Sequence, residues 1–355
     1  MASEDGPAGL ELPRELDPHR LARRAAQVGV AILVLVLLVV LAPGLGDVRR
    51  MVEGAQPEWI ALAVALEALS AASYVLMFRP VFCPHMSWRT SWEIGLSELA
   101  VGSLVPASGA GGLALGAWVL HEGGMPGDKI ARRSVAFFLI KSSVNFVAVA
   151  VLGLLLAFGL LGPELSPWLT AVPAAIAAAV IVGVVLIGRL DPGGAAVPGD
   201  HRVRRAVLAA RRALLGGVAE AVEIVRRRDL LVLAGAVGYW AFDNAVLWAT
   251  YHALGETPPL TVILMGYLIG QLGGLLPLPG GIGGIDGGLI GTLVVYGAPA
   301  AATAGAVLLY RVILFWLPLL AGGAAFVSLR RALNRPDRPD LCMVPPAAPL
   351  PVLRP

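Results

Sequence analysis

The residues from Gly270 to Gly291 read GQLGGLLPLPGGIGGIDGGLIG, and this stretch decides how the chain folds. Ten of its 22 residues are glycine, and Pro277 and Pro279 lie at its centre. Apolar sequence flanks it on both sides, which is typical of a membrane-embedded segment, but proline and glycine prevent a regular helix in its middle. Non-helical backbone at membrane depth is stable only where protein covers it or where it lines a wet cavity. We therefore predict a re-entrant helical hairpin, broken at 276–284, of the kind from which transporters build substrate sites.

The composition predicts an all-α polytopic membrane protein. Of the 355 residues, 57% are hydrophobic and 14% are charged, and the mean hydropathy is +0.78. Soluble domains carry about a quarter charged residues. The two cysteines, Cys83 and Cys342, are too few and too far apart in the sequence to indicate a disulfide framework, and no cluster of His, Cys or acidic residues has metal-ligand spacing. We therefore expect no metal and no other cofactor.

About six transmembrane helices are predicted, because a spanning helix needs about 20 apolar residues. They are 25–42, 58–78, 134–161, 167–188, 229–254 and 301–328. We place Trp59 and Tyr74, in the second of these spans, at the membrane interfaces. The polar sequence before the first span is long and partly acidic, so we expect an uncleaved span rather than a signal peptide.

The remaining segments frame one transmembrane domain at 25–330. Residues 1–24 are polar and residues 331–355 are rich in Pro and Arg, so we expect a cytoplasmic segment and a disordered cytoplasmic tail. Residues 189–228 are basic, and their 202–227 portion has the pattern of an amphipathic helix on the membrane surface.

A second broken segment, 91–121, matches the glycine-rich hairpin at an offset of 171 residues. The matching pairs are Pro106 with Pro277, Gly109 with Gly280, Gly112 with Gly283 and Gly116 with Gly287. The same offset superposes the spans on either side of the hairpins, which predicts an inverted-topology repeat. Its units, 58–161 and 229–328, are linked by the span 167–188 and the basic segment 189–228. The alternative is that the glycines only let helices pack closely.

The positive charges favour re-entrant hairpins over full crossings. If the N-terminus is cytoplasmic and both hairpins return to the side they entered, 23 of the 27 Lys and Arg lie in cytoplasmic segments. Two, Arg49 and Arg50, then lie outside, and the other two, Lys141 and Arg311, lie within spans. Because cytoplasmic loops carry an excess of Lys and Arg, we expect a plasma-membrane protein with both termini in the cytoplasm.

Two motifs resemble the signatures of a known family. The sequence PLPGGIGGID at Pro277–Asp286 resembles Pro-x-Pro-Gly-Gly-x-Gly-x-x-Glu of the lysylphosphatidylglycerol synthetase transmembrane, or flippase-like, family, with Asp in place of the usual Glu. The sequence RVILFWLP at Arg311–Pro318 resembles its second signature, an Arg in the last span followed by an aromatic pair and Pro. Two-domain members add a cytosolic aminoacyltransferase domain. The resemblance covers only the transmembrane part, so it implies lipid translocation without aminoacyl transfer. Residues 107–116 lack the charges that many relatives carry around the matching glycines.

Each charged side chain within a span costs about 2.5–3.5 kcal/mol to insert into the membrane. We therefore expect these side chains to mark the functional site. We expect Arg311 to pair with a carboxylate, Asp286 first and Asp243 second, while a phosphate-binding role for its guanidinium stays open. Asp286 begins the return helix of its hairpin, where it either caps free N–H groups or contacts the substrate. Asp243 either pairs with Arg311 or carries protons, and the sequence does not choose between these roles.

A second cation is predicted at an equivalent depth in the first repeat unit. Lys141 falls within one residue of Arg311 under the offset, and Asn145 shares its helix face. Either Glu98 or Glu67 is expected to counter Lys141, and a structural role is the alternative for Glu67. Two cations at matching depths favour an anionic lipid phosphate as the ligand.

We therefore predict a lipid flippase, not an enzyme, that passes an anionic or zwitterionic headgroup of a membrane phospholipid between the hairpins. The predicted groove residues are Pro277, Pro279, Gly280, Gly281, Gly283 and Asp286 in one hairpin and Pro106, Gly109 and Gly112 in the other. Without a nucleotide-binding motif, transport would be passive or coupled to an ion gradient. No nucleic acid is expected as a partner, and homo-oligomerisation stays open. The alternatives are a membrane scaffold and, less favoured, a membrane-embedded lipid-modifying enzyme.

Overall fold

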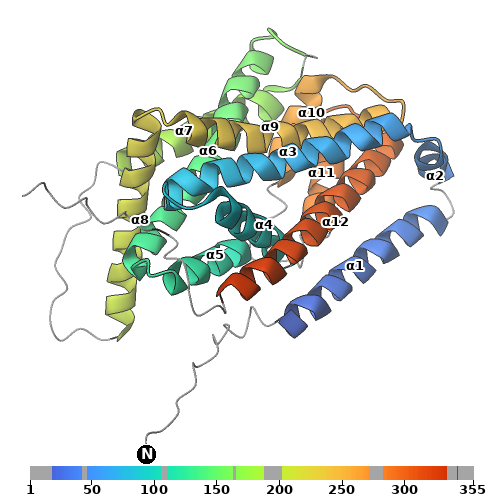
Figure 1. The fold of residues 1–355 in the computed structure, drawn as a ribbon. Helices are drawn as coiled ribbons and strands as arrows, with labels where there is room; N and C mark the ends of the chain where they lie inside the picture. Colours follow the sequence, from blue (N-terminus) through green and yellow to red (C-terminus); the bar gives the residue numbers. More distant parts are fainter. Residues whose placement is uncertain are drawn as a thin grey trace, which may run out of the picture.

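The computed structural model describes residues 18–41, 46–104, 110–162, 165–187, 202–271, 283–333 and 342, and the regular elements in this part of the chain are α-helices (Figure 1). In chain order they are α1 (Pro18–Leu41), α2 (Gly46–Glu53), α3 (Pro57–Phe82), α4 (Trp88–Leu104), α5 (Ala110–Glu122), α6 (Gly127–Ala157), α7 (Pro167–Ile187), α8 (Arg202–Arg226), α9 (Leu230–Ala253), α10 (Leu260–Gly270), α11 (Gly284–Val295) and α12 (Ala300–Leu333). The all-α polytopic class is confirmed.

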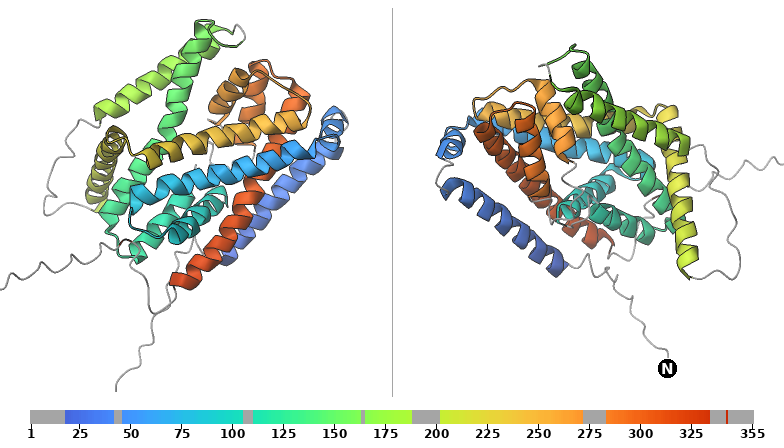
Figure 2. Two further views of the ribbon diagram at one scale, coloured as in Figure 1. Left: turned by 45° about the horizontal axis from the view of Figure 1, so that its top comes forward. Right: turned by 180° about the vertical axis from the view of Figure 1, so that it is seen from behind.

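Five helices are long and apolar enough to cross a membrane: α3, α6, α7, α9 and α12. They match five of the six predicted spans. The other predicted span, 25–42, lies on α1, which starts in the arginine-containing sequence before it and is not among the five. α1 lies along the edge of the molecule (Figures 1 and 2), where a Cβ atom on Gly29 would lie 3.4 Å from the ring of Trp316 on α12. α2 was not predicted, because eight residues are too few to show a hydrophobic periodicity.

α3 and α9 lie side by side through the centre of the molecule (Figure 2). Glycine permits their close approach: a Cβ atom on Gly235 of α9 would lie 2.7 Å from the backbone oxygen of Ser73 on α3. Further along α9, the carbonyl of Tyr239 accepts a hydrogen bond from Ser70 Oγ at 3.2 Å. Residue numbers rise along one helix as they fall along the other, so the two helices are antiparallel. The 171-residue offset relates these same two helices, and antiparallel packing is what an inverted repeat requires.

The four short helices form two pairs, α4 with α5 and α10 with α11. They contain 17, 13, 11 and 12 residues, which at 1.5 Å per residue makes them about 17–26 Å long. Each is shorter than the roughly 30 Å hydrocarbon core. In the second pair, Gly266 faces Leu293 and Gly270 faces Leu289, so α10 and α11 are antiparallel. The connections at 105–109 and 272–282 lie outside the described residues, and the second of them contains all of the predicted break at 276–284 except Gly283 and Gly284.

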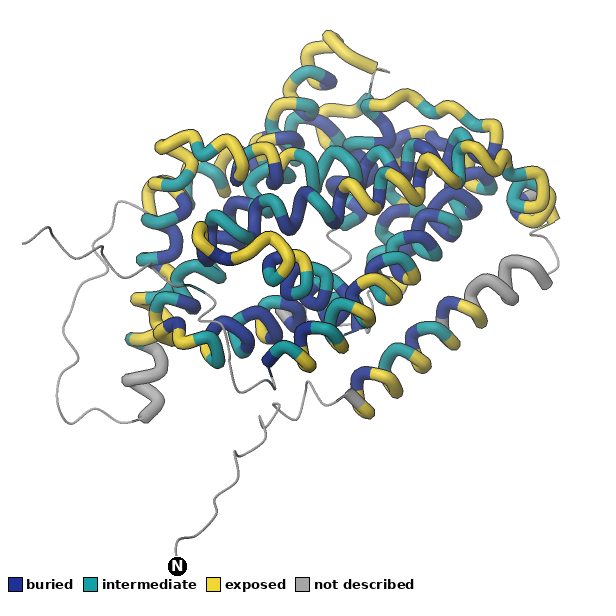
Figure 3. Tube along the Cα trace, in the orientation of Figure 1, coloured by how far each residue is buried: buried dark blue, intermediate teal, exposed yellow. Residues whose placement is uncertain are grey.

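The buried residues concentrate where α3, α9, α12 and the short helices meet, and exposed residues follow the outline (Figure 3). α9 shows how local sequence sets a helix boundary in this bundle. Asp229 caps its start by accepting hydrogen bonds from the N–H groups of Leu231 and Val232 at 3.1 and 3.3 Å. At its end, Gly255 has φ +77°, a conformation that glycine adopts readily.

The basic helix ends gather at one end of the bundle. Arg133, near the start of α6, donates hydrogen bonds to Glu220 on α8 and to the carbonyl of Phe82, the last residue of α3. Ser328, near the end of α12, donates to Glu93 at the start of α4 at 2.8 Å. The segments predicted to be cytoplasmic therefore meet on the same side.

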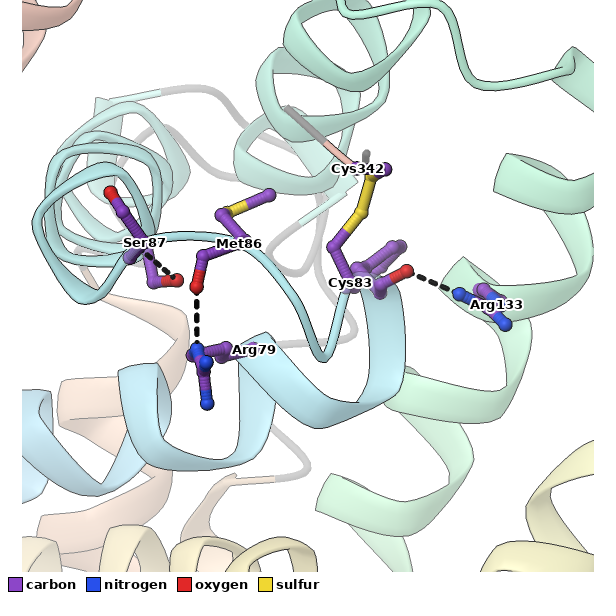
Figure 4. The surroundings of a disulfide bond; sticks show 8 residues. Arg79, Cys83, Met86, Ser87, Arg133 and Cys342 are labelled. Carbon is purple, nitrogen blue, oxygen red and sulfur yellow. Dashed lines mark hydrogen bonds between the residues drawn. A yellow bond between two sulfur atoms is a disulfide. The ribbon is translucent and has the colours of Figure 1, made fainter. Parts of the chain in front are cut away.

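This end also holds a disulfide between Cys83 and Cys342 (Figure 4), with a Cα–Cα distance of 5.5 Å. From the sequence, the two cysteines were judged too few and too far apart to indicate a disulfide framework, and this single bond was not predicted. Their separation of 259 residues in the sequence says nothing about distance in space once α12 returns to the end of α3. Beside Cys83, Arg79 donates a hydrogen bond to the carbonyl of Met86 at 2.6 Å and fixes the turn into α4.

Candidate functional site

Four charged residues lie between two apolar clusters, and we call them the polar layer: Glu67, Lys141, Asp243 and Arg311. The first cluster contains α4, α5 and the basic ends of the long helices. The second cluster contains α10, α11 and the other ends of the long helices. Along α3, α6, α9 and α12 the change from one cluster to the other falls within about one turn of the charged residue. The charges therefore lie at mid-height of the long helices, where each needs a partner.

Arg311 of α12 forms an ion pair with Asp286 of α11. The distance from Arg311 Nε to Asp286 Oδ1 is 2.6 Å, and the two side chains are 12% and 8% exposed. The other carboxylate oxygen of Asp286 accepts a hydrogen bond from the Gly283 N–H at 3.0 Å and so caps the first turn of α11. Gly283 has φ +84°, which explains glycine at this position. The predicted pair is present, and Asp286 serves as cap and as counter-ion together.

Asp243 of α9 is held by tyrosine hydroxyl groups from two other helices. Tyr310 of α12 donates to its Oδ1 at 2.9 Å, and Tyr267 of α10 donates to Oδ2. Arg311 interacts electrostatically with the same carboxyl. Neither tyrosine was predicted from the sequence, where the signal available for them was a phenol within an apolar segment. Asp243 therefore joins the second short-helix pair to α9 and α12.

Glu98 of α4 lies inside the first cluster and is 2% exposed. Its Oε2 accepts a hydrogen bond from the Tyr74 hydroxyl at 2.7 Å. Its Oε1 is buried without a hydrogen-bond partner among the described residues. This oxygen lies so close to Gly116 of α5 that a Cβ atom there would overlap it. The buried contact with Glu98 also corrects the placement of Tyr74 at a membrane interface, because its hydroxyl points to a carboxyl in the interior. Trp59 lies in the first turn of α3.

Lys141 of α6 is half-buried among aromatic rings. Its Nζ lies 5.8, 5.9 and 5.6 Å from the ring centroids of Tyr74, Phe138 and Tyr239, within the range of cation–π attraction. It also interacts electrostatically with Glu98 and Asp243. The predicted counter-ion Glu98 is therefore nearby.

The structure brings the predicted charged residues together but describes only part of the predicted hairpin tips. Gly112 packs so closely on the Glu98 backbone that a Cβ atom would overlap it, and Asn145 is half-buried one turn from Lys141. Among the described residues, no group of three or more His, Cys, Asp or Glu side chains could hold a metal ion. The groove residues that lie outside the described part are Pro106, Gly109, Pro277, Pro279, Gly280 and Gly281.

Comparison with known proteins gives a family match over most of the chain. Residues 26–322 match the model of the family described as lysylphosphatidylglycerol synthase TM region. Two proteins of Methanothermobacter thermautotrophicus (strain Delta H), each named UPF0104 membrane protein, are 25% identical to the chain. One alignment covers 323 residues, 82% of this chain and 90% of the relative, and the other covers 326 residues, 84% and 92%.

Proposed function

Because the chain belongs to the lysylphosphatidylglycerol synthase TM region family, we propose that it moves a phospholipid with an anionic or zwitterionic headgroup between the leaflets of the plasma membrane. The observation that carries this proposal is the polar layer, in which charged side chains from four long helices lie at mid-height between two apolar clusters. A scaffold gains nothing from the insertion cost of these residues, whereas a headgroup that crosses the bilayer needs polar partners at that depth.

Lys141 is the residue on which we centre headgroup binding. Its half-buried ammonium group combines a positive charge with three aromatic rings, whereas Arg311 forms an ion pair with Asp286 at 2.6 Å. Asn145, one turn away on the same helix, adds an amide that suits a phosphate or a glycerol hydroxyl. A phosphate would give Lys141 a direct ion pair in place of its electrostatic interactions with Glu98 and Asp243.

Two features of the bundle support a path for the headgroup. Short helix pairs that are each too short to cross the hydrocarbon core are the elements from which transporters build midplane sites. The antiparallel packing of α3 on α9 supports the inverted repeat that lets such a site face each side in turn. The gathering of the basic helix ends supports a cytoplasmic location for them, since cytoplasmic loops carry the excess of Lys and Arg.

Reconstitution tests the proposal. Purified protein in liposomes is expected to accelerate the exchange of a fluorescent anionic phospholipid between leaflets, measured by quenching the outer leaflet with an impermeant reductant. Lys141→Gln is expected to slow the exchange about tenfold or more, because loss of a charged hydrogen bond of about 1.5–3 kcal/mol corresponds to that factor. The matched control is Lys129→Gln, which removes a charge near the start of the same helix, outside the polar layer. Exchange equal to that of empty liposomes for anionic and zwitterionic headgroups would refute the proposal and favour a scaffold.

A further inference from the structure

Glu67 of α3 lies opposite Asp243 of α9. The antiparallel contacts fix this register: Ser70 bonds Tyr239 on one side of the pair, and Trp59 packs edge-to-face on Trp248, 5.3 Å between ring centroids, on the other. Glu67 falls between the two contacts on α3, and Asp243 falls between them on α9. The two carboxyl groups interact electrostatically with each other, and both interact with the phenol of Tyr239.

The carboxyl groups of Glu67 and Asp243 are both buried but differ in the hydrogen bonds they accept. They are 6% and 9% exposed, and Asp243 accepts hydrogen bonds from two tyrosines. No hydrogen bond from the described residues reaches Glu67. Two ionised carboxylates that face each other in a buried site repel strongly, and the arrangement is stable when they share a proton. Glu67 therefore has a role that the ion pair and the headgroup site do not explain.

The charges around the pair leave the carboxylates in excess. The titratable groups that face it are Tyr239 of α9, Tyr267 of α10, Tyr310 and Arg311 of α12, and Lys141 of α6, with Glu98 of α4 on the far side of Lys141. Arg311 already pairs with Asp286. Arg311 and Lys141 both interact electrostatically with Asp243, and Lys141 also interacts with Glu98. These two positive charges do not balance the four carboxylates Glu67, Asp243, Glu98 and Asp286.

We propose that Glu67 and Asp243 form a proton-binding site that takes up one proton for each headgroup translocated, an inference that rests on the proposed function. Protonation forms one O–H bond on a carboxylate oxygen and removes one negative charge from the surroundings of Lys141. The ammonium group is then available to an anionic phosphate. When the headgroup leaves, the O–H bond breaks, the proton passes to water, and the carboxylate again attracts Lys141. Proton and anionic headgroup therefore bind together and leave together.

The backbone favours a proton over a metal cation at this site. Na⁺ sites in transporters use the carbonyls of unwound helices. α3 and α9 are continuous helices through Glu67 and Asp243, so their carbonyl groups are engaged within the helices. Both oxygens of Asp243 already accept hydrogen bonds from tyrosines, whereas an additional proton on the carboxyl pair needs no further ligand.

The first test measures proton binding without transport. Infrared difference spectra of the purified protein between acidic and alkaline buffer are expected to show a protonated-carboxyl band that persists at neutral pH. Glu67→Gln is expected to remove this band, and Glu58→Gln, an exposed position on the same helix, is expected to retain it. Asp243→Asn removes the acceptor of two tyrosines, so Glu67→Gln is the primary variant. The proton site is refuted if the wild type shows no protonated-carboxyl band at neutral pH, or if Glu67→Gln leaves this band unchanged.

The second test measures coupling in liposomes. A gradient of about one pH unit is expected to give up to about tenfold accumulation of the labelled anionic lipid in one leaflet, the limit for one proton per lipid. Glu67→Gln is expected to abolish this accumulation, and Glu58→Gln is expected to preserve it. Exchange by the wild type that ignores the pH gradient, or that follows a sodium gradient at equal pH, overturns proton coupling and leaves translocation standing. If Glu67→Gln removes the carboxyl band but the wild type exchanges no lipid in liposomes, the proton site stands and translocation is refuted.

Discussion

At the scale of single residues, the interior is organised by carboxylates that each serve more than one helix. Asp286 caps α11 and pairs with Arg311 of α12, and Asp243 accepts tyrosine hydroxyls from α10 and α12. Glu98 joins α4 to α3 through Tyr74. Such buried polar groups are stable only together with their partners, because removal of one partner leaves an uncompensated charge or donor in an apolar interior.

The pair between Arg311 and Asp286 predicts a non-additive response to mutation. Arg311→Leu or Asp286→Leu alone is expected to cost about 3–5 kcal/mol of stability, since each leaves a lone buried charge. The double variant is expected to lose less than either single variant, because it removes both charges. Thermal unfolding of the four proteins in detergent measures the cycle, with Arg89→Leu, an exposed arginine on α4, as the control. Additive losses would contradict a direct energetic pair.

At the scale of helices, glycine sets how closely the elements approach. Gly112 of α5 packs directly on the backbone of α4 at Glu98, whereas nothing lies within 4 Å of a Cβ atom built on Gly287 of α11. The packing alternative in the sequence analysis, that glycines serve close helix contact, therefore holds for Gly112. It does not explain Gly287, although both lie in the second helix of a predicted hairpin.

This difference predicts opposite outcomes for one and the same substitution. Gly112→Ala is expected to destabilise the protein by about 1–3 kcal/mol, because the new methyl group meets rigid backbone. Gly287→Ala, the matched control, is expected to be neutral or stabilising by up to about 1 kcal/mol, since alanine loses less backbone entropy in a helix. Thermal unfolding midpoints in the same detergent measure both. Equal losses in the two variants would show that the close contact at Gly112 does not limit stability.

The helices were more predictable than the contacts between them. Hydropathy over about 20 residues located α3, α6, α7, α9 and α12 because a spanning helix has a length fixed by the bilayer. Arg311 and Asp286 could be paired because a buried charge must have a partner and few candidates existed. Tyr267 and Tyr310 were missed, since nothing in local periodicity states which side chains of distant helices meet.

At the scale of the whole molecule, the basic helix ends lie on one side, and side-chain contacts join the helices there. Arg133 joins α6 to α8 and to the end of α3. Ser328 of α12 bonds Glu93 of α4, and Cys342 meets Cys83. In the proposed orientation this side faces the cytoplasm, where thiols are kept reduced. The same geometry therefore has different expected chemistry in the cell and after purification.

We expect Cys83 and Cys342 to be thiols in intact cells and to form a disulfide on oxidation of the purified protein. A Cα–Cα distance of 5.5 Å lies within the range that a disulfide bridges without backbone movement. In cells, a membrane-permeant maleimide should alkylate both cysteines, and an impermeant one should alkylate neither. After oxidation of the purified protein, mass spectrometry of a non-reducing digest should find their peptides linked, with Cys83→Ser as the control that removes the link. Labelling by the impermeant reagent in cells would place this end outside and invert the proposed orientation, and separate peptides after oxidation would contradict the contact between α3 and Cys342.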